Sequence, residues 1–192
     1  MVEKIKLGSV EIYAPRQIVI EALKHVSSGS VLDIGSGFGR HSLFLADKGF
    51  VVTAIDTANE QLTVLRHKVS QLGLSMRVEK CDLRDFDSED EQYDLILSLM
   101  VLHFLANRDE VLEAIQRMQE MTKVGGVNVV CAYIDKSQLD LRPYLLNSDE
   151  LRKRYTGWDL LRYEELKGTD TNIDGPDKEK LIWRVEIIAR KI

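Results

Sequence analysis

Residues 31–39 read Val-Leu-Asp-Ile-Gly-Ser-Gly-Phe-Gly, a short apolar strand that runs directly into a glycine loop. Glycine allows the backbone to adopt positive φ and to approach a ligand closely. In open α/β sheets, ligands bind at the carboxyl ends of the strands, where the order of the strands reverses. This stretch therefore predicts a ligand site at the end of the first strand of such a sheet.

Strand and helix patterns alternate along the rest of the chain. Short apolar or β-branched runs predict further strands at residues 50–56, 76–81, 93–97 and 127–134, with helices between them at 40–48, 57–72 and 107–122. The alternation predicts an α/β fold: a Rossmann-like, doubly wound, mostly parallel seven-stranded sheet with helices on both faces. The last two strands, 158–163 and 181–189, have no helix between them, so we expect them to pair antiparallel at one edge.

The composition is that of an ordinary globular chain. With 192 residues, 44% hydrophobic and 30% charged, it suits a single domain, residues 1–192, with one core. The formal net charge of −5 argues against a nucleic-acid partner, because phosphate binding needs a basic surface. No apolar run approaches the roughly 20 residues that cross a bilayer, and the first residues do not resemble a signal peptide. We therefore expect a cytoplasmic protein without a membrane partner.

Residue types that bind metals are few. Cys81 and Cys131 lie far apart in the sequence, and we expect two buried thiols in a reducing compartment. The four histidines show no paired His/Cys spacing. The sequence therefore predicts no metal site.

Two residues beside the glycine loop distinguish between two classes of cofactor. The dinucleotide fingerprint GxGxxG/A requires a small third residue for tight helix–strand packing, and Arg40 stands at that position. Asp33 precedes Gly35 by two residues, where a carboxylate would repel a pyrophosphate but attract the ammonium and sulfonium of S-adenosylmethionine. The loop thus favours S-adenosylmethionine, and an NAD-dependent oxidoreductase is the alternative.

Two further acids stand at the ends of the next two strands. Asp56 lies 17 residues past Gly39 (56 − 39), where an acid can accept both ribose hydroxyls. Asp82 can accept from an adenine amino group while Leu83 packs on the ring. Either acid alone could be an ordinary turn or cap residue. Three acids at three consecutive strand ends are more specific than one.

These motifs resemble those of the class I S-adenosylmethionine-dependent methyltransferases. Residues 31–39 look like the family's motif I, Asp56 and Asp82 match its ribose and adenine acids, and residues 98–105 resemble the fourth motif, which faces the transferred methyl. The resemblance implies S-adenosyl-L-methionine as cofactor and S-adenosyl-L-homocysteine as product. The cofactor-binding set that follows is Asp33, Gly35, Ser36, Gly37, Gly39, Asp56, Thr57, Asp82, Leu83 and Ser98. Thr57 also has capping-box spacing to Glu60 and is expected to begin the next helix.

A narrower similarity is to the tellurite-resistance methyltransferases. It is carried by residues 93–105, 150–158 and 188–191, and it implies small chalcogen-containing oxyanions such as tellurite and selenium species as acceptors. Two segments depart from that family's pattern. Thr171-Asn172 stands where the family often has His-Arg, and residues 13–16 replace a Thr-Arg-Thr-His-like segment. The cofactor assignment therefore carries over better than the acceptor.

Methyl transfer from a sulfonium needs alignment and desolvation more than a dedicated catalytic group. His103, after the fourth strand, is a candidate general base, although it can equally pack on the helix that follows. Arg16 is a candidate anchor for an oxyanion, although it can equally be a solvated charge at a helix start.

Two alternatives for the function stay open. The chain could methylate a small organic acid, thiol or amine, or bind S-adenosylmethionine without catalysis. A nucleic-acid methyltransferase is disfavoured because the fourth motif lacks the Asn/Asp-Pro-Pro-aromatic pattern. We expect a small-molecule acceptor and a monomer or homodimer.

Overall fold

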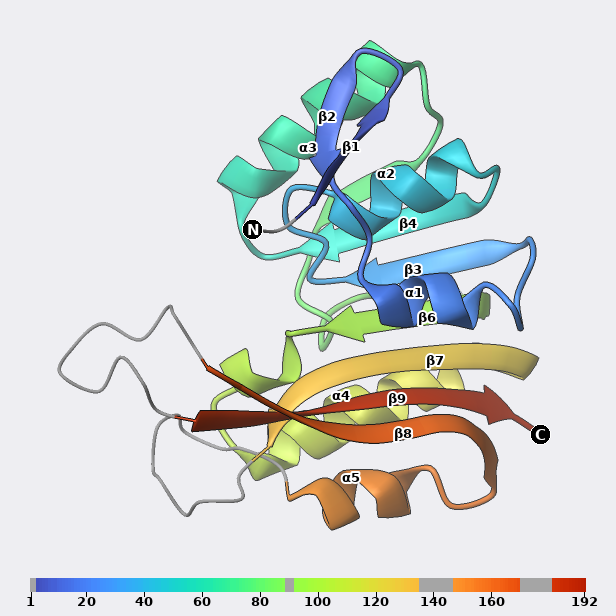
Figure 1. The fold of residues 1–192 in the computed structure, drawn as a ribbon, viewed down its shortest axis with the longest axis vertical. Helices are drawn as coiled ribbons and strands as arrows, with labels where there is room; N and C mark the ends of the chain where they lie inside the picture. The colour runs from blue at the N-terminus through green and yellow to red at the C-terminus, as the bar shows by residue number, and fades with distance from the viewer. Residues whose placement is uncertain (1–2, 89–91, 135–146, 170–180) are drawn as a thin grey trace, which may run out of the picture.

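The computed structural model describes residues 3–88, 92–134, 147–169 and 181–192, and a seven-stranded sheet organises them (Figure 1). The strand order is β5-β4-β3-β6-β7-β9-β8. The strands are β3 (Ser30–Ile34), β4 (Val51–Asp56), β5 (Arg77–Lys80), β6 (Tyr93–Leu99), β7 (Thr122–Ile134), β8 (Trp158–Thr169) and β9 (Leu181–Lys191). Neighbouring strands from β5 to β7 are parallel, and β9 is antiparallel to both β7 and β8. The predicted fold class and the antiparallel last strand are confirmed, with β9 inserted between β7 and the edge strand β8.

Helices cover both faces of the sheet, as predicted. They are α1 (Gln17–Ala22), α2 (Arg40–Asp47), α3 (Asn59–Leu72), η1 (Leu102–Phe104), α4 (Arg108–Glu120) and α5 (Ser148–Arg154). Apolar residues of α1 and α2 pack with Val31 and Leu97 on one face of the sheet. Residues of α4 and α5 pack with Leu32 and Ile96 on the other. Because successive strand residues point to opposite faces, the central strands β3 and β6 bury apolar residues on both sides.

The strand order reverses between β3 and β6. From β3 the chain builds outward through β4 and β5, then returns to place β6 on the other side of β3. Such a switch point leaves a crevice at the carboxyl ends of the strands. The register pairs Ile34 with Ser98 and Asp33 with Leu97, so the ends of β3 and β6 lie at the same level.

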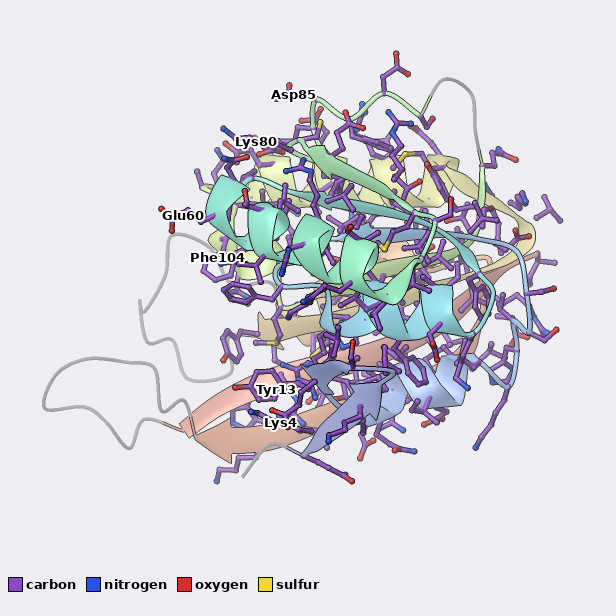
Figure 2. The ribbon with its side chains drawn as sticks, turned by 90° about the horizontal axis from the view of Figure 1, so that it is seen from above. Lys4, Tyr13, Glu60, Lys80, Asp85 and Phe104 are labelled. Carbon is purple, nitrogen blue, oxygen red and sulfur yellow. The ribbon has the colours of Figure 1, made fainter. Side chains whose placement is uncertain are left out.

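An N-terminal hairpin, β1 (Lys4–Leu7) and β2 (Val10–Tyr13), is not predicted by the sequence patterns. Its buried side chains, Leu7 among them, pack on Leu62 and Leu65 of α3. The outer side carries Lys4 and Tyr13, with the Lys4 Nζ 5.8 Å from the centre of the Tyr13 ring (Figure 2). The hairpin delivers the segment Ala14–Arg16 to the N-terminal turn of α2, where Arg40 Nε donates to the Ala14 carbonyl at 2.6 Å.

The capping box predicted at Thr57 is wrong. Helix α3 begins at Asn59 after Ala58, and no side chain caps it. The Asp56 carboxylate instead accepts a hydrogen bond from the Ala58 N–H at 2.8 Å, because the chain turns directly at the strand end. The predicted connection around Thr171-Asn172 lies outside the described residues. No helix in the described part of the chain is long and apolar enough to cross a membrane.

Candidate functional site

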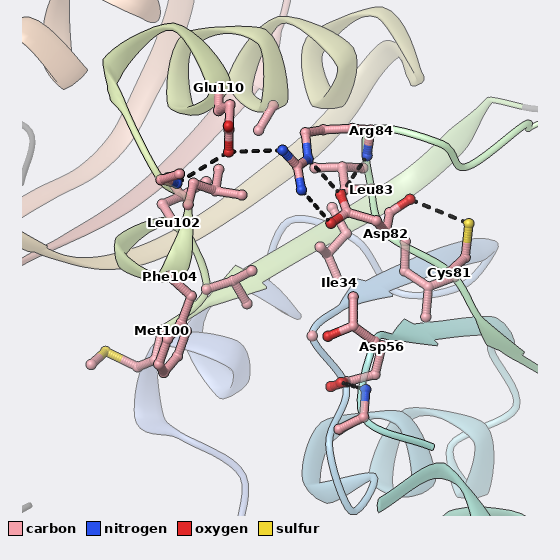
Figure 3. Close-up of a pocket in the computed structure, with 18 of the residues that line it drawn as sticks. Ile34, Asp56, Cys81, Asp82, Leu83, Arg84, Met100, Leu102, Phe104 and Glu110 are labelled. Atoms are coloured by element: carbon pink, nitrogen blue, oxygen red, sulfur yellow. Dashed lines mark hydrogen bonds and ion pairs between the residues drawn. The ribbon is translucent and has the colours of Figure 1, made fainter. Parts of the chain in front are cut away.

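A cavity of about 700 Å³ opens at the switch point between β3 and β6 (Figure 3). Its walls come from the ends of β3 and β4, the loop after β5, and the segment between β6 and α4. Phe104, which is 72% exposed, lines this cavity (Figure 3). The size and the mixed lining are those of a small-molecule or cofactor site. Of the predicted cofactor residues, those lining the cavity are Gly35, Asp56, Thr57, Asp82 and Leu83.

The glycine loop is held against β4 by hydrogen bonds. The N–H groups of Gly35 and Ser36 both donate to the Ile55 carbonyl, at 2.9 and 3.0 Å. Gly35 has φ +66, and a Cβ added there would lie 2.3 Å from Val101 Cγ2. Side chains are excluded at Gly35 by both conformation and space. The backbone of the loop therefore packs directly against Val101, in the segment after β6, with no space for a side chain at Gly35.

Asp56 braces this loop. Its Oδ2 accepts from the Gly37 N–H at 2.8 Å, and its Oδ1 accepts from the Ala58 N–H at the same distance. The side chain also lines the cavity. Two backbone donors thus fix a carboxylate that keeps further lone pairs for hydroxyl donors. The ribose role of Asp56 stays a prediction, and the structure places its carboxylate in the cavity lining.

The far wall of the cavity carries an ion-pair network that the sequence patterns do not predict (Figure 3). Arg84 donates to Asp82 three times: from its backbone N–H and Nε to Oδ1, each at 2.9 Å, and from Nη2 to Oδ2 at 2.8 Å. Its Nη1 also pairs with Glu110 of α4 at 2.8 Å. The Arg84 guanidinium holds the pKa of Asp82 below its usual range. Asp82 is therefore an ionised acceptor, fixed in orientation.

Asp33 lies on the opposite face of the sheet from this cavity. It is 1% exposed and accepts a hydrogen bond from Ser42 Oγ of α2, whereas its neighbour Ile34 faces the cavity. Burial raises the pKa of Asp33 to about 7, despite the Ser42 hydrogen bonds that lower it. A ligand that uses Asp56, Asp82 and Asp33 together must therefore cross the sheet edge over the glycine loop.

Two predicted serines are buried near the loop. Ser36 is 7% exposed and Ser98 fully buried, and neither hydroxyl has a hydrogen-bond partner within the described ranges. Neither residue lines the cavity, and nor do Gly37 and Gly39. Buried hydroxyls usually have a hydrogen-bond partner in folded proteins, so these two are available to a bound polar group.

The two catalytic candidates lie near the carboxyl end of β7. Arg16 is close enough to Cys131 for its charge to oppose the burial that raises the pKa of that thiol to about 11. The ring of His103, in η1, is 4.6 Å from the ring of Tyr133. Cys131 and Tyr133 are two residues apart in β7, so they share one face of the strand. Arg16 and His103 are thus brought to one region.

Contacts fix the ring of His103 and the backbone of Arg16. His103 is 4% exposed and packs against Phe104 and Tyr133. The backbone N–H of Arg16 donates to Nε2 of His41 at 3.4 Å. Burial lowers the pKa of His41 to about 3, so His41 is the neutral acceptor that this contact needs.

The family model described as "Tellurite resistance protein TehB" matches residues 9–180 of this chain. The chain belongs to this family. This membership confirms the similarity to the tellurite-resistance methyltransferases that the sequence shows at residues 93–105, 150–158 and 188–191.

Individual relatives agree. The chain is 33% identical over 161 residues to a probable S-adenosyl-L-methionine-dependent methyltransferase TehB from Haemophilus influenzae, covering 80% of this chain and 56% of the relative. It is 29% identical over 174 residues to Hemagglutinin 1 from Eikenella corrodens, covering 89% and 57%. This chain thus spans just over half the length of these curated relatives. The crystal structure of TehB from Haemophilus influenzae superposes with a TM-score of 0.82 at 30% identity, covering 93% of this chain and 63% of that one.

Proposed function

We propose that this TehB family chain is an S-adenosylmethionine-dependent methyltransferase, with S-adenosylhomocysteine as product. The observation that carries the proposal is the convergence of Asp56 and Asp82 on one cavity, with Gly35 at the end of the neighbouring strand β3. Acceptors for a ribose and for an adenine amino group then lie at the two strand ends beside the glycine loop. The names of the TehB relatives from Haemophilus influenzae support the same cofactor.

The residues present fit this cofactor. Asp56 would hold the ribose next to Thr57, and Asp82 and Leu83 the adenine. The methionine part would cross Gly35, Ser36, Gly37 and Gly39 toward Asp33. The unpartnered hydroxyls of Ser36 and Ser98 support a polar ligand near this loop. When bound, the cofactor supplies a methyl group on a sulfonium, which is already a good leaving group.

The chain's own contribution is then mostly positional. The described walls of the cavity exclude water from one side of the cofactor, and the fixed carboxylates orient it. We propose that Arg16 binds an anionic acceptor and that His103 takes a proton from acceptors that carry one. Both side chains come to the end of β7, on the sheet face that also carries Asp33.

For the acceptor we propose a small soft nucleophile of the tellurite or selenium oxyanion type, methylated in the cytoplasm. The family description supports it, and a cation such as Arg16 near the end of β7 suits an oxyanion. Headspace mass spectrometry with tellurite, selenite and a panel of thiols tests it. Volatile methylated products from the thiols alone would instead favour the alternative of a small organic acid, thiol or amine. Formation of S-adenosylhomocysteine with any acceptor would exclude a module that only binds the cofactor.

The cofactor assignment is tested by isothermal titration calorimetry with S-adenosylmethionine and with NAD. We expect heat with S-adenosylmethionine only, and a sharp loss of affinity in Asp56→Ala. Asp47→Ala is the matched control, because Asp47 is an exposed acid at the end of α2, outside the cavity lining. Binding of NAD without binding of S-adenosylmethionine would refute the proposal.

A further inference from the structure

Met100, directly after β6, has an unusual backbone conformation. Its φ is +66°, and it is the one non-glycine residue in the described ranges with positive φ. Amino acids with a side chain rarely adopt this region, and residues that keep it cluster at functional sites. Met100 lies at the switch point of the sheet and lines the cavity. Glycine would adopt this φ without strain. A methionine at this position therefore indicates a role for its side chain.

Two contacts with Cys131 of β7 hold Met100 in place. Its backbone N–H donates to the Cys131 carbonyl at 2.6 Å, which fixes the turn. The Cys131 Sγ lies 3.5 Å from the Met100 Sδ, with the thiol donating to the thioether. Because burial raises the pKa of the Cys131 thiol to about 11, the thiol keeps its proton at neutral pH. The side chain as well as the backbone of Met100 is therefore oriented.

The place of this side chain in the cavity follows from its neighbours. Val101, the next residue, touches the glycine loop at Gly35. In Figure 3, Met100 lies across the cavity from Asp82 and Arg84. The strand order β5-β4-β3-β6 places Asp82, Asp56 and Gly35 in that order along the sheet edge, so a cofactor with adenine at Asp82 and ribose at Asp56 would have its sulfur on the side of the glycine loop and β6. Met100 stands at that junction.

A thioether sulfur suits a sulfonium. It is soft and polarizable, and it has two lone pairs, of which the Cys131 thiol uses one. The other is available to a positive charge. A sulfonium would gain from this contact, whereas the neutral thioether of the demethylated product would not.

We propose that Met100 is a specificity-determining residue whose thioether contacts the sulfonium of bound S-adenosylmethionine and favours this cation over S-adenosylhomocysteine. This inference rests on the proposed function. It gives the site a means of releasing its product, since affinity falls when the positive charge leaves with the methyl group. None of the cofactor-binding residues predicted from the sequence has this role.

The test is calorimetry of both ligands with the wild type, Met100→Leu and Met100→Gly. Met100→Leu keeps the apolar volume and removes the sulfur. We expect it to weaken S-adenosylmethionine by about threefold to tenfold, the size of weak sulfur contacts, and to leave S-adenosylhomocysteine unchanged. Met100→Gly should lose the same preference and stay folded at the assay temperature, since glycine accepts the positive φ and so offsets part of the packing lost with the side chain. Met76→Leu, on a partly buried methionine outside the cavity lining, is the control.

The outcomes separate the two proposals. If the wild type binds neither ligand, the proposed function fails. If the wild type binds S-adenosylmethionine and Met100→Leu leaves the ratio of the two affinities unchanged, the role of Met100 is refuted. An equal loss for both ligands also refutes it, because the side chain would then contribute shape alone.

Discussion

Asp33 should make cofactor binding depend on pH. Its carboxyl is 1% exposed, and burial raises its pKa to about 7. The proposed partners of this group are the ammonium and sulfonium of S-adenosylmethionine, which attract only the ionised form. The ionised fraction rises with pH through the pKa, so affinity should rise as pH increases toward 7. The experiment therefore varies pH, and Asp33→Asn is the variant that lacks the titrating carboxyl.

The size of the effect follows from the fraction of ionised protein. For a pKa of about 7, roughly 1%, 9% and 50% of Asp33 is ionised at pH 5, 6 and 7. If only that fraction binds, the dissociation constant is divided by it. Affinity should then be about fivefold lower at pH 6 than at pH 7, and about fiftyfold lower at pH 5. Asp33→Asn should bind weakly, with a nearly flat profile, while its amide oxygen can still accept from Ser42.

Isothermal titration calorimetry between pH 5 and 7 measures this dependence and keeps the cofactor's α-amino group, with a pKa near 8, protonated. Repeating the titration in buffers of different ionisation enthalpy also counts protons released on binding. We expect release of up to one proton per site by the wild type below pH 7, and none by Asp33→Asn. A flat wild-type profile, or the same slope in both proteins, would refute the link between the burial of Asp33 and cofactor affinity.

Two further outcomes are expected. Gly39→Ala, at φ +82 with an added Cβ 2.2 Å from Leu65 Cδ1, should lower the free energy of unfolding in urea by about 1–3 kcal/mol. It should cost more than Gly73→Ala, which has φ +62 and open space; equal losses would contradict the crowding argument. Arg84→Lys keeps the positive charge but loses the bidentate hydrogen bonding to Asp82. It should raise KM for the cofactor by about threefold to tenfold with little change in kcat. A fall in kcat alone would count against a positioning role.

The positions along the chain of the five strands from β3 to β7 follow from patterns that are local in the sequence. Apolar runs, glycines and helical stripes predict the strands from β3 to β7 and the helices between them, because periodicity reports which faces are buried. The N-terminal hairpin escaped prediction because each of its strands has four residues. The insertion of β9 between β7 and β8 depends on how two antiparallel strands meet the existing edge, which no local pattern reports.

Some features of the cofactor site are likewise predicted by the sequence, and others are seen only in the tertiary structure. Sequence spacing alone placed Gly35, Asp56 and Asp82 together, since the carboxyl ends of parallel strands meet at one edge of a sheet. Tertiary structure alone paired Arg84 with Glu110 and turned Asp33 to the opposite face. It also set the thioether of Met100, whose backbone has positive φ, against Cys131, 31 residues away in the chain. The physical reason is that the positions of the strand ends follow from the alternation of strand and helix patterns in the local sequence. Contacts between side chains on different elements depend instead on strand order and packing, which arise only when the whole sheet assembles.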